Sequence, residues 1–156
     1  MFRAILAVIV IAIAVPATAQ APRIGGMEVR PAGSDLVMLP ALDETGCRTP
    51  MLIWRCQNDS AKVIYAFDME IAAGITPEIT VAIDGQSLAQ NMEWQLSRTR
   101  RNALLPDPAG FTAAARAGRE VRFRVVDPHS TAELFDRFDL TGLVMRLEEL
   151  PCALHE

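Results

Sequence analysis

The amino-acid sequence predicts a mainly β protein: an antiparallel β-sandwich or curled sheet of roughly six or seven strands with two short helices. The first observation is that apolar and polar residues alternate through most of the chain after residue 35. A period of two is typical of half-buried antiparallel strands. The second observation is that turn signals, such as Asn58-Asp59-Ser60 and Asp84-Gly85, separate these alternating runs.

The expected strands follow one another with short connections. The alternating runs are residues 35–39, 51–56, 61–70, 76–83, 90–96, 119–126 and 131–140. Both tryptophans, Trp54 and Trp94, fall in these runs, where we expect them to pack in the core. Arg122 and Arg124 share the opposite face of their strand, so we expect them on its solvent side. In the last run we expect a bulge. It would bring two pairs of residues to the core: Leu134 with Asp136, and Phe138 with Leu140.

Two helices are expected after residue 105. Asp107 is suited to cap a helix that opens with Pro108 and ends at Gly118. A side-chain acceptor just before the first turn and a proline within that turn are both favourable at a helix start. Residues 143–150 place apolar side chains at helical spacing, and Pro151 would end this second helix.

The first nineteen residues have the features of a secretory signal peptide. Arg3 precedes an unbroken apolar run over residues 4–15, and Ala17-Thr18-Ala19 supplies small residues for cleavage after Ala19. This run is shorter than the roughly twenty residues of a spanning helix, so we expect no retained membrane anchor. We predict a signal peptide over residues 1–19, a flexible leader over 20–34, a single β-rich domain over 35–156, and a periplasmic location.

Composition narrows the class of partner. The chain has 156 residues and a formal net charge of −4 at pH 7. One domain of this length can bury a sizeable core. Nucleic acid is a poor partner for an acidic chain, so we expect no nucleic-acid binding.

The three cysteines, Cys47, Cys56 and Cys152, suit an oxidising compartment. Their spacing alone permits any of the three pairings, with one thiol left over. The spacings do not resemble paired zinc ligands, so we expect no metal site.

Few residues suggest catalysis. The sequence has no GxSxG, HExxH, phosphate-loop or dinucleotide-binding motif. Asp127, His129 and Ser130 lie within one tight turn, whereas a catalytic triad is assembled from separate parts of a fold. We interpret them as a polar turn that satisfies its own backbone. We therefore expect a protein that is not an enzyme and that needs no cofactor.

A local basic run stands out in this acidic chain. Ser97, Arg98, Arg100 and Arg101 surround Thr99, and together they could bind a carboxylate, a phosphate or an acidic partner surface. The competing interpretation, which we favour, is a solvated hairpin end.

Short segments of the chain resemble the TagO/VasI family of accessory proteins associated with type VI secretion. Pro50-Met51-Leu52-Ile53-Trp54-Arg55-Cys56 is similar to its element of a proline, an apolar strand and Arg-Cys. The sequences Val81-Ala82-Ile83-Asp84-Gly85 and Trp94-Gln95-Leu96-Ser97 resemble two later elements. Phe138-Asp139-Leu140-Thr141-Gly142-Leu143 matches the segment that precedes a short helix and a terminal cysteine, here Cys152.

This resemblance implies a non-catalytic β domain with a Cys56–Cys152 disulfide and an accessory role with a protein partner in the cell envelope. A Cys47–Cys56 staple is the main rival pairing. Two other functions remain open. One is a periplasmic binding module that inhibits lysozyme, with residues 97–101 as its inserting loop. The other is a hydrolase whose site the sequence does not reveal.

Overall fold

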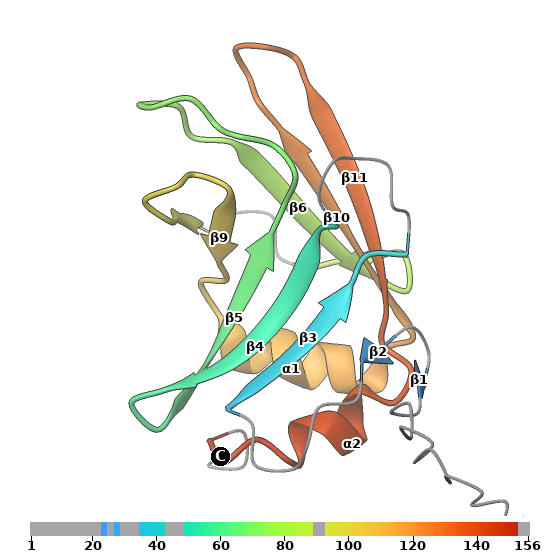
Figure 1. The fold of residues 1–156 in the computed structure, drawn as a ribbon. Helices are drawn as coiled ribbons and strands as arrows, with labels where there is room; N and C mark the ends of the chain where they lie inside the picture. The colour runs from blue at the N-terminus through green and yellow to red at the C-terminus, as the bar shows by residue number, and fades with distance from the viewer. Residues whose placement is uncertain (1–22, 25–26, 29–34, 43–48, 89–92, 153–156) are drawn as a thin grey trace, which may run out of the picture.

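Two antiparallel sheets face each other across a shared core in the computed structural model of the chain (Figure 1). The structure describes residues 23–24, 27–28, 35–42, 49–88 and 93–152. The predicted signal peptide, most of the predicted leader and Cys47 lie outside the described residues. Seven described strands have three residues or more. The prediction of a mainly β, antiparallel two-sheet fold is therefore confirmed.

The larger sheet has five strands in the order β3-β4-β5-β9-β8. Their bounds are Leu36–Pro40 for β3, Met51–Gln57 for β4, Ser60–Ala66 for β5, Gln95–Leu96 for β8 and Asn102–Leu104 for β9. The β4–β5 hairpin turns at Asn58 and Asp59, with φ values of 51° and 60°. Both residue types tolerate this left-handed conformation, so the predicted turn is confirmed.

The smaller sheet has four strands in the order β11-β10-β6-β7. Their bounds are Glu78–Ile83 for β6, Gln86–Ser87 for β7, Glu120–Val126 for β10 and Glu133–Asp139 for β11. A separate two-stranded pair joins β1 (Arg23–Ile24) to β2 (Met27–Glu28). The five-stranded and four-stranded sheets approach each other at one edge, where the Leu42 amide donates to the Arg137 carbonyl at 2.7 Å.

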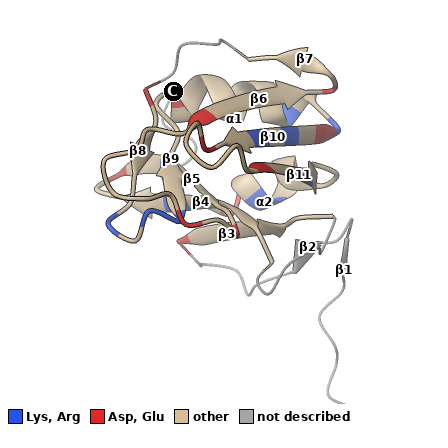
Figure 2. Cartoon of the chain, turned by 90° about the horizontal axis from the view of Figure 1, so that it is seen from above, with Lys and Arg blue, Asp and Glu red and all other residues tan. Residues whose placement is uncertain are grey.

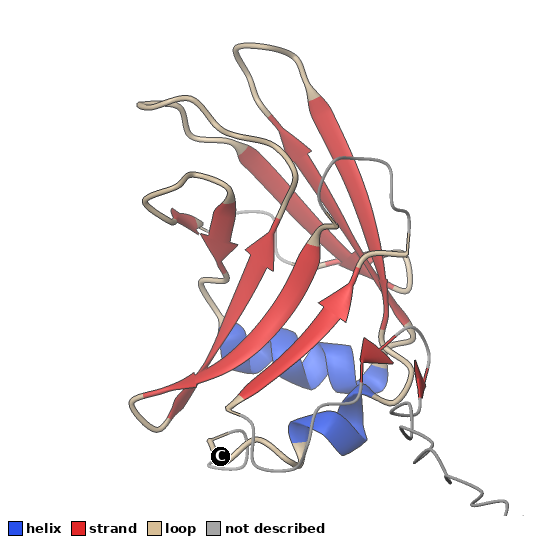
Figure 3. Cartoon of the chain, viewed as in Figure 1, coloured by secondary structure: helices blue, strands red, loops and turns tan. Residues whose placement is uncertain are grey.

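Both helices lie at one end of the sheets (Figure 3). Helix α1 (Pro108–Ala117) starts as predicted, because the Asp107 carboxylate accepts a hydrogen bond from the Gly110 amide at 2.9 Å. It ends at Gly118, where an added Cβ would lie only 2.3 Å from Ile83 Cγ2. Glycine thus lets α1 approach β6 closely.

An aromatic cluster joins the two sheets and α1. Tyr65 of β5 stacks on Phe123 of β10 with ring centroids 4.2 Å apart. Phe111 of α1 lies 5.8 Å from Trp54 and 6.2 Å from Phe123 between ring centroids. All four side chains are buried. The predicted core position of Trp54 is confirmed, and Trp94 is half-buried with its ring edge-on to that of Phe123.

Three local predictions need correction. The pairing of β10 with β11 is continuous from Glu120↔Asp139 to Val126↔Glu133, so the predicted bulge is wrong. Plain alternation already points every second residue inward, including Asp136 and Phe138. Helix α2 (Leu143–Leu147) is shorter than the predicted 143–150, and turns carry the chain on to Pro151. In the predicted strand 90–96, residues 90–92 are not described, and only Gln95–Leu96 pairs as strand.

A disulfide joins Cys56 of β4 to Cys152 beyond α2, with Cα atoms 5.6 Å apart. The two cysteines are 96 positions apart in sequence. The bridge therefore closes a loop that contains the whole smaller sheet, strands β5, β8 and β9 of the larger sheet, and both helices. Constraining so long a loop in the unfolded chain stabilises the fold by about 4–5 kcal/mol in the chain-entropy model.

Replacing both bridge cysteines in the double variant Cys56→Ala/Cys152→Ala should lower the free energy of unfolding by about 4 kcal/mol. Urea unfolding monitored by tryptophan fluorescence measures this loss. The matched control Cys47→Ala removes the remaining cysteine and should leave the unfolding midpoint unchanged. A larger loss for the control than for the double variant would contradict the pairing.

Candidate functional site

The predicted basic run forms the turn between β8 and β9. The Ser97 amide donates to the Asn102 carbonyl at 2.8 Å, and the Arg100 amide donates to the Ser97 carbonyl at 2.9 Å. Arg100 adopts a left-handed φ of 55°. The structure thus brings Ser97, Arg98, Arg100 and Arg101 together in one tight loop.

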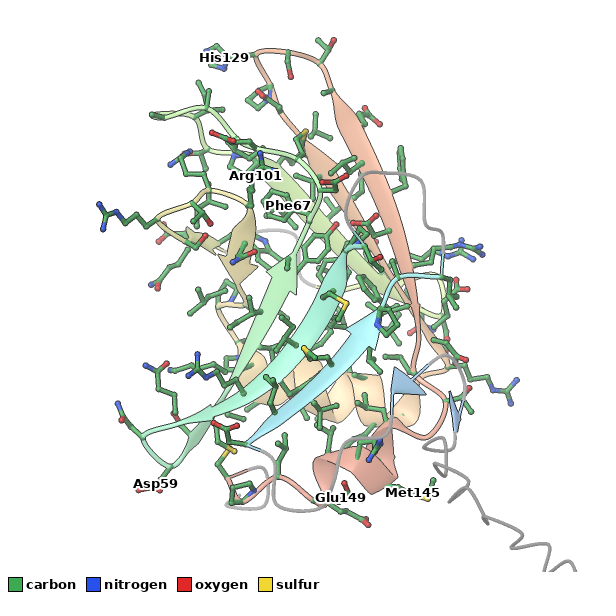
Figure 4. The ribbon with its side chains drawn as sticks, viewed as in Figure 1. Asp59, Phe67, Arg101, His129, Met145 and Glu149 are labelled. Atoms are coloured by element: carbon green, nitrogen blue, oxygen red, sulfur yellow. A yellow bond between two sulfur atoms is a disulfide. The ribbon has the colours of Figure 1, made fainter. Side chains whose placement is uncertain are left out.

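Two of these arginines serve the fold. The Arg100 guanidinium donates to the carbonyls of Ile71 and Ile75, at 2.8 Å for its Nε–H and Ile71. It therefore fastens the loop after β5 to the β8–β9 turn. Arg101 pairs with Glu70 at 2.8 Å, and its carbonyl accepts from the Phe67 amide at 3.0 Å. Figure 4 labels Arg101 and Phe67 side by side.

Arg98 lies at the exposed tip of the same turn. The Ser97 and Thr99 hydroxyls are 3.0 Å apart and stiffen that tip. Of the four predicted contact residues, Arg98 has the side chain best placed to meet a partner. Part of the basic run is thus structural, and the rest is a small exposed loop.

Arg122 and Arg124 lie on the solvent side of β10, as expected, and both form ion pairs. Figure 2 shows the basic residues along β10 in blue. Arg122 Nε lies 2.5 Å from the Glu120 carboxylate, and Arg124 lies 2.8 Å from that of Glu133. Exposed pairs of this kind contribute little to stability but keep the face polar.

The turn at Asp127 satisfies its own backbone, as predicted. The Asp127 carboxylate accepts from the amides of His129 and Ser130 at 2.9 and 3.4 Å. These hydrogen bonds, that of His129 first, lower the pKa of Asp127. His129 is exposed at the hairpin tip, at the opposite end of the molecule from Asp59 (Figure 4). Asp127, His129 and Ser130 form a turn rather than a nucleophile–base pair.

A second carboxylate, Asp84, ties a turn to the next strand. It accepts from the Glu120 amide at 2.9 Å and from the Arg119 amide at 3.1 Å. These two backbone donors, that of Glu120 first, lower the pKa of Asp84. The Asp84-Gly85 turn of β6–β7, predicted from the sequence, thereby also anchors the start of β10.

One buried polar pair was not predicted from the sequence. The Tyr65 hydroxyl donates to the Asp136 carboxylate between the two sheets. Burial, and then the nearby Asp136, raise the pKa of Tyr65 far above its usual range. Tyr65 therefore stays protonated and can supply a donor to a carboxylate that is only 4 % exposed. Tyr65 and Asp136 are 71 positions apart, so a sequence pattern that spans only a few residues could not reveal their contact.

A pocket of about 470 Å³ opens between the β4–β5 hairpin and α1. It is lined by Trp54, Asp59, Ser60, Ala61, Lys62, Pro108, Ala109, Thr112, Ala113, Arg116 and Cys152. Its size falls in the usual range for small-ligand sites. The Trp54 indole N–H donates to the Thr112 hydroxyl at 3.0 Å, which fixes one side of α1 against β4.

Arg116 is the most unusual group in this pocket. Its Nε atom is buried and has no hydrogen-bond partner among the residues that the structure describes, whereas buried donors are almost always paired. Arg116 was not predicted as a site residue. The sequence did contain a hint: Pro108, Thr112 and Arg116 are spaced by four, and residues four apart share one face of a helix.

Among the described residues, no group of three or more His, Cys, Asp or Glu side chains is arranged to hold a metal ion. None of the helices in the described ranges combines the length and apolarity that crossing a bilayer requires.

Comparison with known proteins gave no match: no family model, no curated protein and no solved structure matches this chain.

The Asp84 and Asp127 carboxylates make the free energy of unfolding depend on pH in the acidic range. Both pKa values are lowered in the folded state, so the stabilisation is complete above the ordinary pKa of about 4. It is lost as the pH falls through the lowered folded values. The double variant Asp84→Asn/Asp127→Asn should therefore show a shallower fall in unfolding free energy between about pH 5 and pH 2. Urea titrations at several pH values measure it, and identical slopes for the two proteins would contradict this origin.

Proposed function

We propose that the protein is a non-catalytic accessory protein of the cell envelope that works by binding a protein partner, in association with type VI secretion. The Cys56–Cys152 disulfide is the observation that carries the proposal, because the TagO/VasI resemblance implies this bridge and not the rival Cys47–Cys56 pairing. A disulfide also suits the oxidising periplasm that the N-terminal sequence predicts.

The structural roles of the resembling residues support the same proposal. Phe138, Leu140 and Leu143 are 0–3 % exposed and belong to the core. Gly142, with a φ of 77°, lets the chain turn from β11 directly into α2. The Phe-x-Leu-x-Gly-Leu segment is thus a framework element that leads to the bridged Cys152. These buried residues maintain the fold and do not contact a partner. We therefore expect any partner to bind elsewhere, on the surface of the domain.

The first test is an affinity capture from periplasm with the tagged, disulfide-bonded protein in a strain that has a type VI secretion system. Enrichment of envelope components of that system, identified by mass spectrometry, is expected. The matched control is the same protein reduced and alkylated, which should lose the enrichment because the bridge stabilises the fold. Equal recovery of those components with both forms, or none with the oxidised form, would contradict the proposal.

A lysozyme inhibitor is the second candidate, favoured by the β8–β9 turn. Arg100 fastens this turn to the carbonyls of Ile71 and Ile75, so Arg98 is presented on a pre-organised loop. A loop that already holds its bound conformation binds more tightly, because it loses less conformational entropy on binding.

If this second function holds, the protein slows lysozyme, and Arg98→Ala weakens inhibition at least about tenfold through loss of a charge-assisted contact. A turbidity assay on cell walls measures the inhibition. Arg122→Ala, on the outer face of the smaller sheet, is the control and should inhibit normally. Lysozyme activity unaffected by the wild-type protein would remove this candidate.

A further inference from the structure

The pocket beside α1 adjoins an exposed stretch of strand edge. On β5, the pairing with β9 covers only Ile64–Ala66, and the Leu105 amide extends the contact to the Val63 carbonyl. Because peptide groups alternate between the two sides of an antiparallel strand, those of Ala61 point to the same side as those of Val63. Ala61 lies beyond the last β9 contact and lines the pocket. Its N–H and C=O can therefore receive an added extended segment.

The charge around the pocket favours an anion. Arg116 and Lys62 line it together with a single acidic residue, Asp59. Lys62 also lies directly opposite Arg55 in the β4–β5 register, and like charges in that position are destabilising. The Arg116 side chain is half-buried, and its buried Nε–H has no partner among the described residues. The terminal N–H groups of its guanidinium are the donors that can meet a carboxylate in the pocket.

Most of the remaining lining residues are small, and apart from Ser60 and Thr112 they are apolar. Ala109 and Ala113 present methyl groups from one face of α1, while the buried Trp54 lies beneath the pocket floor and Cys152 lines the side of the disulfide. This surface suits a small aliphatic side chain rather than a bulky or charged one.

We propose that this pocket binds the C-terminal end of a peptide. The terminal carboxylate pairs with the Arg116 guanidinium, which matches it in planar geometry. The peptide main chain hydrogen-bonds to the free edge at Ala61, and a small aliphatic last side chain packs over Ala109 and Ala113. This binding site goes beyond the accessory role proposed above and does not depend on where in the cell the protein works.

A peptide fits the mixed lining better than a fatty acid does. A fatty acid would leave the peptide groups of Ala61 unpaired and would place an alkyl chain beside Asp59 and Lys62. An extended peptide satisfies the strand edge and supplies the carboxylate in one ligand.

The test is an NMR titration of the disulfide-bonded, isotope-labelled protein with acetyl-Ala-Ala-Ala. The free acid should cause saturable shifts of the Ala61, Thr112 and Ala113 amides. The C-terminal amide of the same peptide should bind at least about tenfold more weakly, because it lacks the charge-assisted pair with Arg116.

Protein variants separate the parts of the site. Arg116→Gln should weaken binding of the free acid at least about tenfold. Ala113→Leu should block the site while keeping a good helix former on α1. Arg122→Gln removes an exposed arginine from the outer face of the smaller sheet, away from the pocket, and is the matched control, with unchanged affinity expected.

Three results would overturn the assignment. The first is equal affinity for the free acid and the amide, or for wild type and Arg116→Gln. The second is saturation of the same amides by acetate as tightly as by the tripeptide, which would mean that only a carboxylate is recognised. The third is the lack of saturable shifts at these amides up to about 10 mM peptide, where even a weak complex is populated.

Discussion

The contact between Tyr65 and Phe123 is the interaction on which the rest of the structure depends. These stacked rings join the inner faces of the two sheets, and Phe111 of α1 packs against the same Phe123 ring. Phe138 of β11 meets it edge-on at 5.7 Å. One phenylalanine thus contacts both sheets and the helix that closes their end. The position of α1 against β4, and with it the pocket, follows from this cluster.

The Tyr65 hydroxyl adds a polar constraint to an apolar contact. Because it donates to Asp136, the stacked ring is also fixed in rotation and depth between the sheets. A phenylalanine at position 65 could fill the space but would leave a buried carboxylate with one donor fewer. The pair therefore specifies how the sheets align, at the cost of burying two polar groups.

The sequence predicted those parts of the fold that depend on neighbouring residues. Alternation located β4, β5, β6 and β10, and the cap at Asp107 located α1, because both signals act over a few positions. The inward carboxylate at Asp136 was expected with a bulge that the strand does not need. The role of Arg100 and the unpaired Arg116 were missed, because each depends on segments brought together only by folding. Spacing alone left the cysteine pairing open for the same reason.

The long separation of Cys56 and Cys152 has a consequence for how the chain matures. When the chain enters an oxidising compartment N-terminus first, Cys56 arrives 96 residues before the cysteine with which it pairs. During that interval Cys47, nine positions away, is the nearer thiol. Local pairing closes a short loop at little entropic cost, so it is kinetically favoured over the native bridge. Maturation to a homogeneous product therefore calls for thiol–disulfide exchange, and a cell that lacks disulfide isomerase should accumulate a mispaired form.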